Sequence, residues 1–126
     1  AYPELRSTKS GFEYAENFMR GGFAMQFRFE PKDQKIRLIG MRRFEFGPAN
    51  NDGSGESSVN LLTNQYIGDW NYWDEEDSEL KKIPTIRKKM VFPKVYLDGK
   101  ISETFETYQE KCSNWFNAEK KRLLKF

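Results

Sequence analysis

The 126 residues (15.0 kDa, 16% aromatic) are enough for a single domain over 1–126 with a well-filled core, which excludes a disordered chain. With no histidine and a single cysteine, the chain cannot form a Ser-His-Asp or Cys-His nucleophile system, a histidine-ligated metal site or an intrachain disulfide. The net charge of +2 gives little support for a nucleic-acid partner, and no run approaches the roughly 18 apolar residues of a membrane span.

The first third of the chain predicts a loose arm followed by a hairpin. Residues 1–10 are mostly polar and contain a proline, so we expect a loose N-terminal arm. The pattern from Gly11 to Met19 fits either a strand or a helical face. Gly21-Gly22 suits a primed two-residue turn, and a strict alternation follows it, which favours a hairpin over 12–30.

The next segment predicts a second long strand and a loop. A turn over 31–34 leads into a strand from Lys35 to Phe46, which Gly40 is expected to interrupt with a bulge. The period of two places four apolar residues of this strand on one face: Ile36, Leu38, Phe44 and Phe46. Residues 47–58 are rich in Asn, Asp, Gly and Ser, which is typical of a loop.

Two further strands are expected at 59–63 and 66–73. One or two more lie within 83–97, where Pro84 and Pro93 require an edge or a break.

The chain ends in a predicted amphipathic helix over 101–126, with Ser102 as its N-cap. Its apolar positions follow helical spacing: Ile101, Phe105, Tyr108, Cys112, Trp115, Phe116 and Leu123. Cys112 lies on this stripe, so we expect a buried thiol and not a reactive one. The sequence therefore predicts an α+β fold: a curved antiparallel sheet of five to seven strands over 11–97, packed against a C-terminal helix.

The charges are unevenly distributed. Residues 1–79 carry 9 basic and 14 acidic side chains, whereas residues 80–126 carry 12 and 5. A basic surface would explain this, but pairing of the acidic run 74–79 with Lys81, Lys82 and residues 87–89 explains it better.

The loop offers a weak candidate for a calcium site. Oxygen-bearing side chains stand at every second position: Asn50, Asp52, Ser54 and Glu56. Calcium loops use this spacing, but only two of the four are carboxylates, and a solvated hairpin loop explains the composition better. We expect no cofactor.

The aromatic run at 70–73 is the strongest candidate for binding. Trp70, Tyr72 and Trp73 could form a flat platform for a sugar or for a protein partner, unless one face of the strand is simply core. Charged neighbours would complete this binding surface: Asp69, Arg42 and Arg43. Asp69 and Asp74 flank the run as the two catalytic carboxylates of a glycosidase flank its cleft. A chain with 19 acidic residues, however, contains such a pair by chance.

Part of the chain resembles a stretch found in small exported bacterial proteins. The resemblance covers Phe27 to Thr63, with Phe27-Arg28-Phe29, Arg37-Leu38-Ile39-Gly40 and residues 58–63 as its motifs. In that group Gly-Lys usually follows the threonine, where this chain has Asn64-Gln65. The resemblance implies a β-rich fold, a bacterial periplasmic or secreted location and a non-catalytic character.

These observations favour a non-catalytic binding or interaction module of the bacterial envelope or secreted space, such as an inhibitor or immunity-type protein. Its expected partner is another protein. A carbohydrate-binding module that uses the aromatic platform is the alternative.

Overall fold

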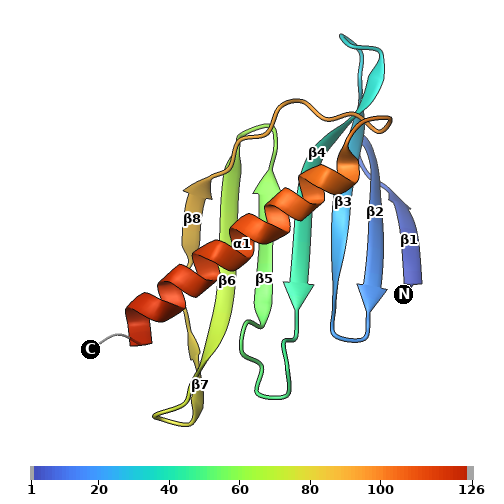
Figure 1. Ribbon diagram of the computed structural model, residues 1–126. Helices are drawn as coiled ribbons and strands as arrows, with labels where there is room; N and C mark the ends of the chain where they lie inside the picture. The colour runs from blue at the N-terminus through green and yellow to red at the C-terminus, as the bar shows by residue number, and fades with distance from the viewer. Residues whose placement is uncertain (1, 125–126) are drawn as a thin grey trace.

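The structure, a computed structural model, describes residues 2–124. These residues form eight strands and one helix: β1 (Tyr2–Ser7), β2 (Gly11–Phe18), β3 (Gly21–Glu30), β4 (Lys35–Glu45), β5 (Gly55–Asn60), β6 (Gln65–Asp74), β7 (Glu79–Lys82), β8 (Ile86–Lys89) and α1 (Ile101–Leu124). Strands β1 to β7 lie side by side in chain order, every pair antiparallel, and β8 also pairs with β6. Helix α1 runs diagonally across one face of the sheet (Figure 1). The predicted α+β fold with a curved antiparallel sheet is confirmed.

The N-terminal segment is not a loose arm, so that prediction is wrong. Tyr2 to Ser7 form β1, which pairs residue by residue with β2. Pro3 is tolerated because β1 is an edge strand, and an edge strand needs only half of its N–H groups for pairing.

The predicted hairpin over 12–30 is confirmed as β2 and β3, and Gly11 to Met19 is therefore not helical. Its turn, however, lies at Met19 and Arg20, and both glycines belong to β3. A Cβ atom at Gly22 would come within 2.8 Å of the Phe44 ring on the next strand. The glycine pair thus serves close packing between strands and not the turn.

The predicted bulge in β4 is confirmed. The β3–β4 register shifts where Ile39 stands as an extra residue beside Gly40. As a result Leu38 and Met41 are both buried, while Phe44 faces away from the helix. The prediction of one shared face for Ile36, Leu38, Phe44 and Phe46 is wrong, because the extra residue reverses the alternation beyond the bulge.

The loop after β4 is shorter than predicted. Strand β5 begins at Gly55 and ends at Asn60, so the expected strand over 59–63 is displaced and residues 61–64 form a turn. The sequence of β5 is mostly polar, but burial alternates regularly along the strand: Ser57 and Val59 are buried and their neighbours are exposed. Pairing with β4 on one side and β6 on the other stabilises this strand despite its composition.

The sheet ends in a broken edge, as the prolines predicted. Strands β7 and β8 pair with opposite ends of β6, and Pro84 lies in the gap between them. Farther along, Val95 and Leu97 bond to β4: the N–H of Leu38 donates to the Val95 carbonyl, and the N–H of Leu97 donates to Ile36 (2.8 Å each). This segment extends the sheet beyond the end of β5.

Helix α1 confirms the predicted amphipathic helix over Ile101–Leu124, but Ser102 lies within it and is not its N-cap; residues 125 and 126 of the predicted range lie outside the described part of the chain. The backbone carbonyl of Lys100 accepts bonds from the N–H and the hydroxyl of Thr104. The apolar stripe faces the sheet: Phe105, Tyr108 and Cys112 are buried there, which confirms the predicted burial of the cysteine. The core lies between this stripe and the inner faces of β3 to β6 and β8.

Candidate functional site

The predicted aromatic platform is not formed. Trp70 and Tyr72 are only 3% and 6% exposed, because this face of β6 packs under α1, and Trp73 is partly buried. An aromatic ring needs an open face to stack a ligand. The prediction of a stacking surface at 70–73 is therefore wrong, and the core explanation holds.

The charged residues predicted beside this platform all border one pocket, which Arg42, Arg43 and Asp69 line together, but they come from both faces of the sheet. Arg42 and Arg43 are neighbours in a strand and point to opposite faces of the sheet. Arg42 binds the Glu13 carboxylate on the face away from the helix, whereas Arg43 lies beneath α1. Asp69 accepts a hydrogen bond from the Thr85 hydroxyl at 2.5 Å.

The four residues of the candidate calcium loop are engaged separately. The Asp52 carboxylate accepts bonds from Lys120 Nζ and from the Trp73 N–H, and the Ser54 hydroxyl accepts one from an Asn71 side chain. Asn50 bonds within the loop, and Glu56 lies in β5. Across residues 2–124 no group of three or more acidic or cysteine side chains could hold a metal ion. The structure does not assemble the predicted ligand set.

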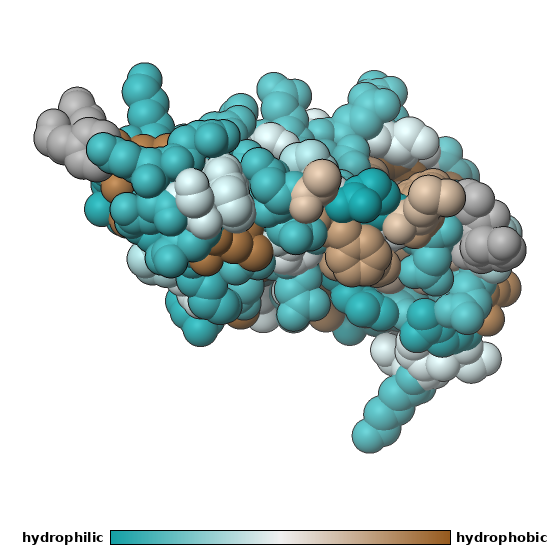
Figure 2. Space-filling model, turned by 90° about the horizontal axis from the view of Figure 1, so that it is seen from below, coloured by the Kyte–Doolittle hydropathy of each residue, from teal (hydrophilic) through white to brown (hydrophobic). Residues whose placement is uncertain are grey.

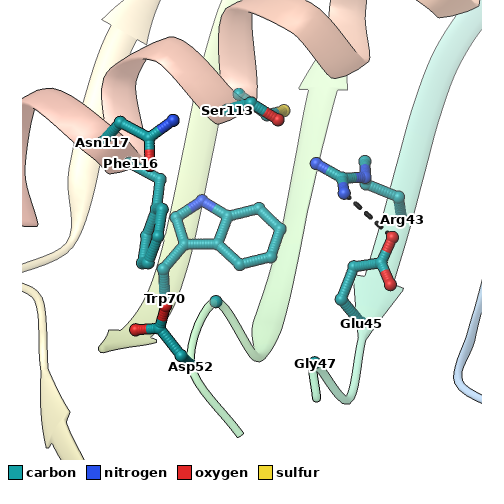
Figure 3. A pocket seen from close by; sticks show the side chains of 10 residues that line it. Arg43, Glu45, Gly47, Asp52, Trp70, Ser113, Phe116 and Asn117 are labelled. Carbon is teal, nitrogen blue, oxygen red and sulfur yellow. Dashed lines mark hydrogen bonds and ion pairs between the residues drawn. The ribbon is translucent and has the colours of Figure 1, made fainter. Parts of the chain in front are cut away.

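A pocket of about 240 Å³ lies between α1, the end of β4 and the loop that follows it. Ten residues line it: Arg43, Glu45, Gly47, Asp52, Gly53, Trp70, Cys112, Ser113, Phe116 and Asn117. Figure 3 shows the Trp70 indole at its centre, Phe116 and Asn117 reaching in from the helix, and Arg43 with Glu45 on the opposite side.

Arg43 is the central charged group of this pocket. Its guanidinium carbon lies 5.2 Å from the centre of the Trp70 ring, and its Nη2 donates to Glu45 at 3.0 Å. Burial tends to lower the pKa of this guanidinium, but its hydrogen bond to the Glu45 carboxylate and its contact with Cys112 together outweigh burial, and the net shift is upward. The group stays charged, and its buried Nε has no hydrogen-bond partner within the described part of the chain.

Buried hydroxyls join the sheet to the helix beside the pocket. The Ser57 hydroxyl lies 2.7 Å from the Tyr108 hydroxyl, and Trp70 Nε1 donates to the Tyr66 hydroxyl at 3.1 Å. Burial is the main cause that raises the pKa of both tyrosines well above the ordinary value. Both phenols therefore stay protonated near neutral pH and do not supply a general base.

Sequence reasoning did not find this pocket. It named Trp70 and Arg43 but missed Ser113 and Asn117 in the lining and Ser57 beside the pocket. The one available signal was a serine at an inward position of a strand, which indicates a buried polar contact once the strand is recognised. That strand was assigned to the loop.

A second surface lies at the end of the sheet where the β2–β3 turn meets the β4–β5 loop. Three apolar side chains are exposed there, which we call the apolar end: Phe18 (47%), Met19 (94%) and Phe46 (49%). Arg20 fixes the turn, because its Nε donates to the Gly47 carbonyl at 2.6 Å and its Nη2 to the Pro48 carbonyl at 3.1 Å. Figure 2, which views this end, shows apolar surface set among hydrophilic side chains.

The predicted pairing of the acidic run at 74–79 is confirmed for Lys81, whereas the described residues show no ion pair between this run and Lys82 or residues 87–89. The ammonium group of Lys81 binds Asp74 at 2.8 Å and also contacts Asp77. The hydrogen bonds that Lys81 donates to these two carboxylates are the leading cause that raises its pKa.

Comparison with known proteins gives no match: no protein-family model, no curated protein and no solved structure is similar to this chain. Among residues 2–124 no helix has the length and apolar character that crossing a bilayer requires.

Proposed function

We propose that the protein is a non-catalytic binding module that holds another protein through its apolar end (Phe18, Met19 and Phe46). The observation that carries this proposal is the position of Met19, whose side chain is 94% exposed at the tip of a turn. A few large apolar anchors supply most of the energy of a typical interface. Methionine suits this role because its flexible thioether adapts to the partner's surface.

The rigidity of the turn supports the same proposal. Arg20 bonds two carbonyls of the neighbouring loop, and its own carbonyl accepts from the Phe46 N–H at 3.2 Å. A turn that is already ordered loses little conformational entropy on binding.

The acidic residues considered for catalysis have other partners, which supports the non-catalytic part of the proposal. Asp69 accepts a hydrogen bond from Thr85, and Asp74 binds Lys81. An inhibitor or immunity-type role in the bacterial envelope or secreted space remains part of the proposal, on the resemblance of residues 27–63. The glycan alternative loses its platform with the burial of two of its three rings.

The test is affinity capture from an envelope fraction of the source cells, with the intact chain as bait. Met19→Ser and Phe46→Ser should each lower the affinity for the captured protein about tenfold or more, because one buried apolar side chain contributes about 1.5–3 kcal/mol. The matched control is Leu80→Ser, which removes a 42% exposed apolar side chain elsewhere on the surface. Equal capture by all four proteins, or no saturable partner, would contradict the proposal.

A further inference from the structure

Strand β1 leaves one side of its backbone unpaired within residues 2–124, because it is the outermost strand of the sheet. Figure 1 shows it at the margin, outside the part that α1 crosses. In the turn after β1 the N–H of Thr8 donates to the carbonyl of Gly11, the first residue of β2, at 3.0 Å. Hydrogen-bonded pairs recur at every second residue of an antiparallel ladder, so Arg6 also bonds β2. The N–H and C=O groups of Leu5 and Ser7 therefore point outward.

The other edge of the sheet is unsuited to pairing with a second chain. It consists of β7 and β8, which have four residues each and end in cations. Their basic side chains are Lys81, Lys82, Arg87, Lys88 and Lys89. Short, strongly charged edge strands resist edge-to-edge association. Strand β1, by contrast, has six residues in unbroken register with β2, and its acidic and basic side chains balance each other: Glu4 and Arg6.

The side chains of β1 offer an apolar surface on one face of the sheet and charges on the other. Leu5 lies opposite Tyr14, on the face that the helix covers farther into the sheet, and it is 70% exposed. A second apolar side chain beside it would shield it from water. Glu4 and Arg6 point to the opposite face, where they form an ion pair at 2.7 Å and each remains about half exposed.

We propose that β1 pairs antiparallel with β1 of a second copy of this chain, so that the protein forms a symmetric dimer with one continuous sheet. The two Leu5 residues lie opposite each other at the two-fold axis. The interface is the outward side of β1 and not the apolar end, so the inference goes beyond the proposed function and does not depend on it.

Charge and backbone geometry select this register. Glu4 lies opposite the partner's Arg6, and Arg6 lies opposite the partner's Glu4, so opposite charges meet at both positions. The two Leu5 residues exchange N–H···O=C bonds, and the Ser7 N–H donates to the carbonyl of the partner's Pro3. Pro3 has no N–H to donate in return, but it stands near the end of the strand. Outward groups occur at every second residue, so the neighbouring registers are two residues away. They place Glu4 opposite Glu4 or Arg6 opposite Arg6, which destabilises the pair.

The test is sedimentation velocity of the intact chain over a range of concentrations, with amide hydrogen exchange measured by NMR on the same samples. An interface of one strand from each protomer is small, so we expect a dissociation constant on the order of 100 µM. The amides of Leu5 and Ser7 should exchange about fourfold more slowly at about 1 mM than at about 10 µM, because most of the chain is then dimeric. The amides of Glu4 and Arg6 already bond β2 and should exchange at a constant rate.

Two charge reversals test the register. Glu4→Lys and Arg6→Glu each place like charges opposite each other at both positions, so each should weaken the dimer about tenfold. An equimolar mixture of the two variants brings opposite charges together again and should dimerise as tightly as the parent chain, which also shows that both variants fold. Glu106→Lys, which makes the same charge change at an exposed position of α1, is the control and should leave the dimer intact.

The proposal fails if the chain stays monomeric at about 1 mM, or if it dimerises while the Leu5 and Ser7 amides exchange at a rate independent of concentration. A mixture that associates no more tightly than either variant alone would overturn the register. Met19→Ser should leave the dimer unchanged, and loss of the dimer in this variant would assign self-association to the apolar end instead of β1.

Discussion

The hydroxyl of Ser57 lies 2.7 Å from the hydroxyl of Tyr108, in the buried space between β5 and α1. Both side chains are almost completely shielded from water. Ser57 is the side-chain hydrogen-bond partner of Tyr108, and the Ser57 hydroxyl also lies 3.5 Å from the Cys112 sulfur; these contacts fix the helix on the sheet at the side of the pocket.

Removing one member of this pair should destabilise the fold. Ser57→Ala leaves the Tyr108 hydroxyl buried without its partner and should lower the free energy of unfolding by about 1–3 kcal/mol. Tyr108→Phe leaves Ser57 with only the weakly bonding Cys112 thiol and should cost about 1 kcal/mol or more. In the double variant the two losses should not add, with a coupling of about 1 kcal/mol. Urea unfolding measures all four proteins, and Ser58→Ala, at an exposed position next to Ser57, is the control. Strictly additive losses would show that the two hydroxyls do not interact.

The carboxylate of Glu13 should make stability depend on pH in the acid range. Burial pushes the pKa of this group upward, but hydrogen bonds from Gln26 and Arg42 and the charges of Arg42 and Arg6 outweigh it, so the pKa lies below its ordinary value of 4.5. A lowered pKa in the folded state adds stability that is fully present above pH 4.5 and is lost as the pH falls through the lowered value.

Glu13→Gln should therefore be less stable than the parent chain at pH 7, and the difference should shrink below pH 4.5. Thermal melts between pH 7 and pH 3 measure it. Glu106→Gln, at an exposed position of α1, should follow the parent chain throughout. A difference between parent and Glu13→Gln that is constant over this pH range would contradict the linkage.

Glycine is required where β5 begins. The backbone at Gly55 has φ near +140°, and a Cβ atom there would lie 2.0 Å from the carbonyl oxygen of Asp69. Gly55→Ala should cost about 3 kcal/mol or more, since both strain and a backbone clash oppose it. Gly53→Ala is the comparison: φ is +81°, but no atom outside its chain neighbours lies nearer than 3.8 Å, so strain alone should cost about 1–2 kcal/mol. Chemical denaturation separates the two, and equal costs would rule out the clash.

The sheet and the helix could be predicted from the sequence because their signals are local. Alternation from Phe23 to Phe29 and helical spacing from Ile101 to Leu123 depend only on neighbouring residues. The bulge at Gly40 could also be predicted, but the prediction for Phe44 did not include the reversal of side-chain direction beyond the bulge. The two errors of assignment, at β1 and β5, concern polar strands that are held by pairing with their neighbours.

The candidate site could not be predicted, because it depends on which face of β6 the helix covers. The alternation at 66–73 puts aromatic residues on both faces, and the sequence alone does not tell which face is buried. The structure places Trp70 beneath α1 and beside Arg43, a residue 27 positions earlier in the chain. A contact of this kind follows from strand register, which a single sequence specifies only weakly here.

Asp52 joins three parts of the chain, and its loss should therefore have a larger effect than the loss of its cation. Its carboxylate accepts a hydrogen bond from the backbone N–H of Trp73 at 2.8 Å and binds Lys120 on α1 at 2.9 Å. Asp52→Ala leaves that N–H without its acceptor and should lower the free energy of unfolding by about 1–3 kcal/mol.

Lys120→Met removes only the ion pair, whose two side chains are about one quarter exposed, and should cost about 0–1 kcal/mol. Hydrogen exchange separates the two contributions, because the Trp73 amide should exchange faster in Asp52→Ala and at an unchanged rate in Lys120→Met. Lys121→Met, which removes the exposed cation next in sequence, is the control. If the lysine variant destabilised the chain as much as the aspartate variant, the ion pair and not the backbone bond would be what holds the loop to β6 and α1.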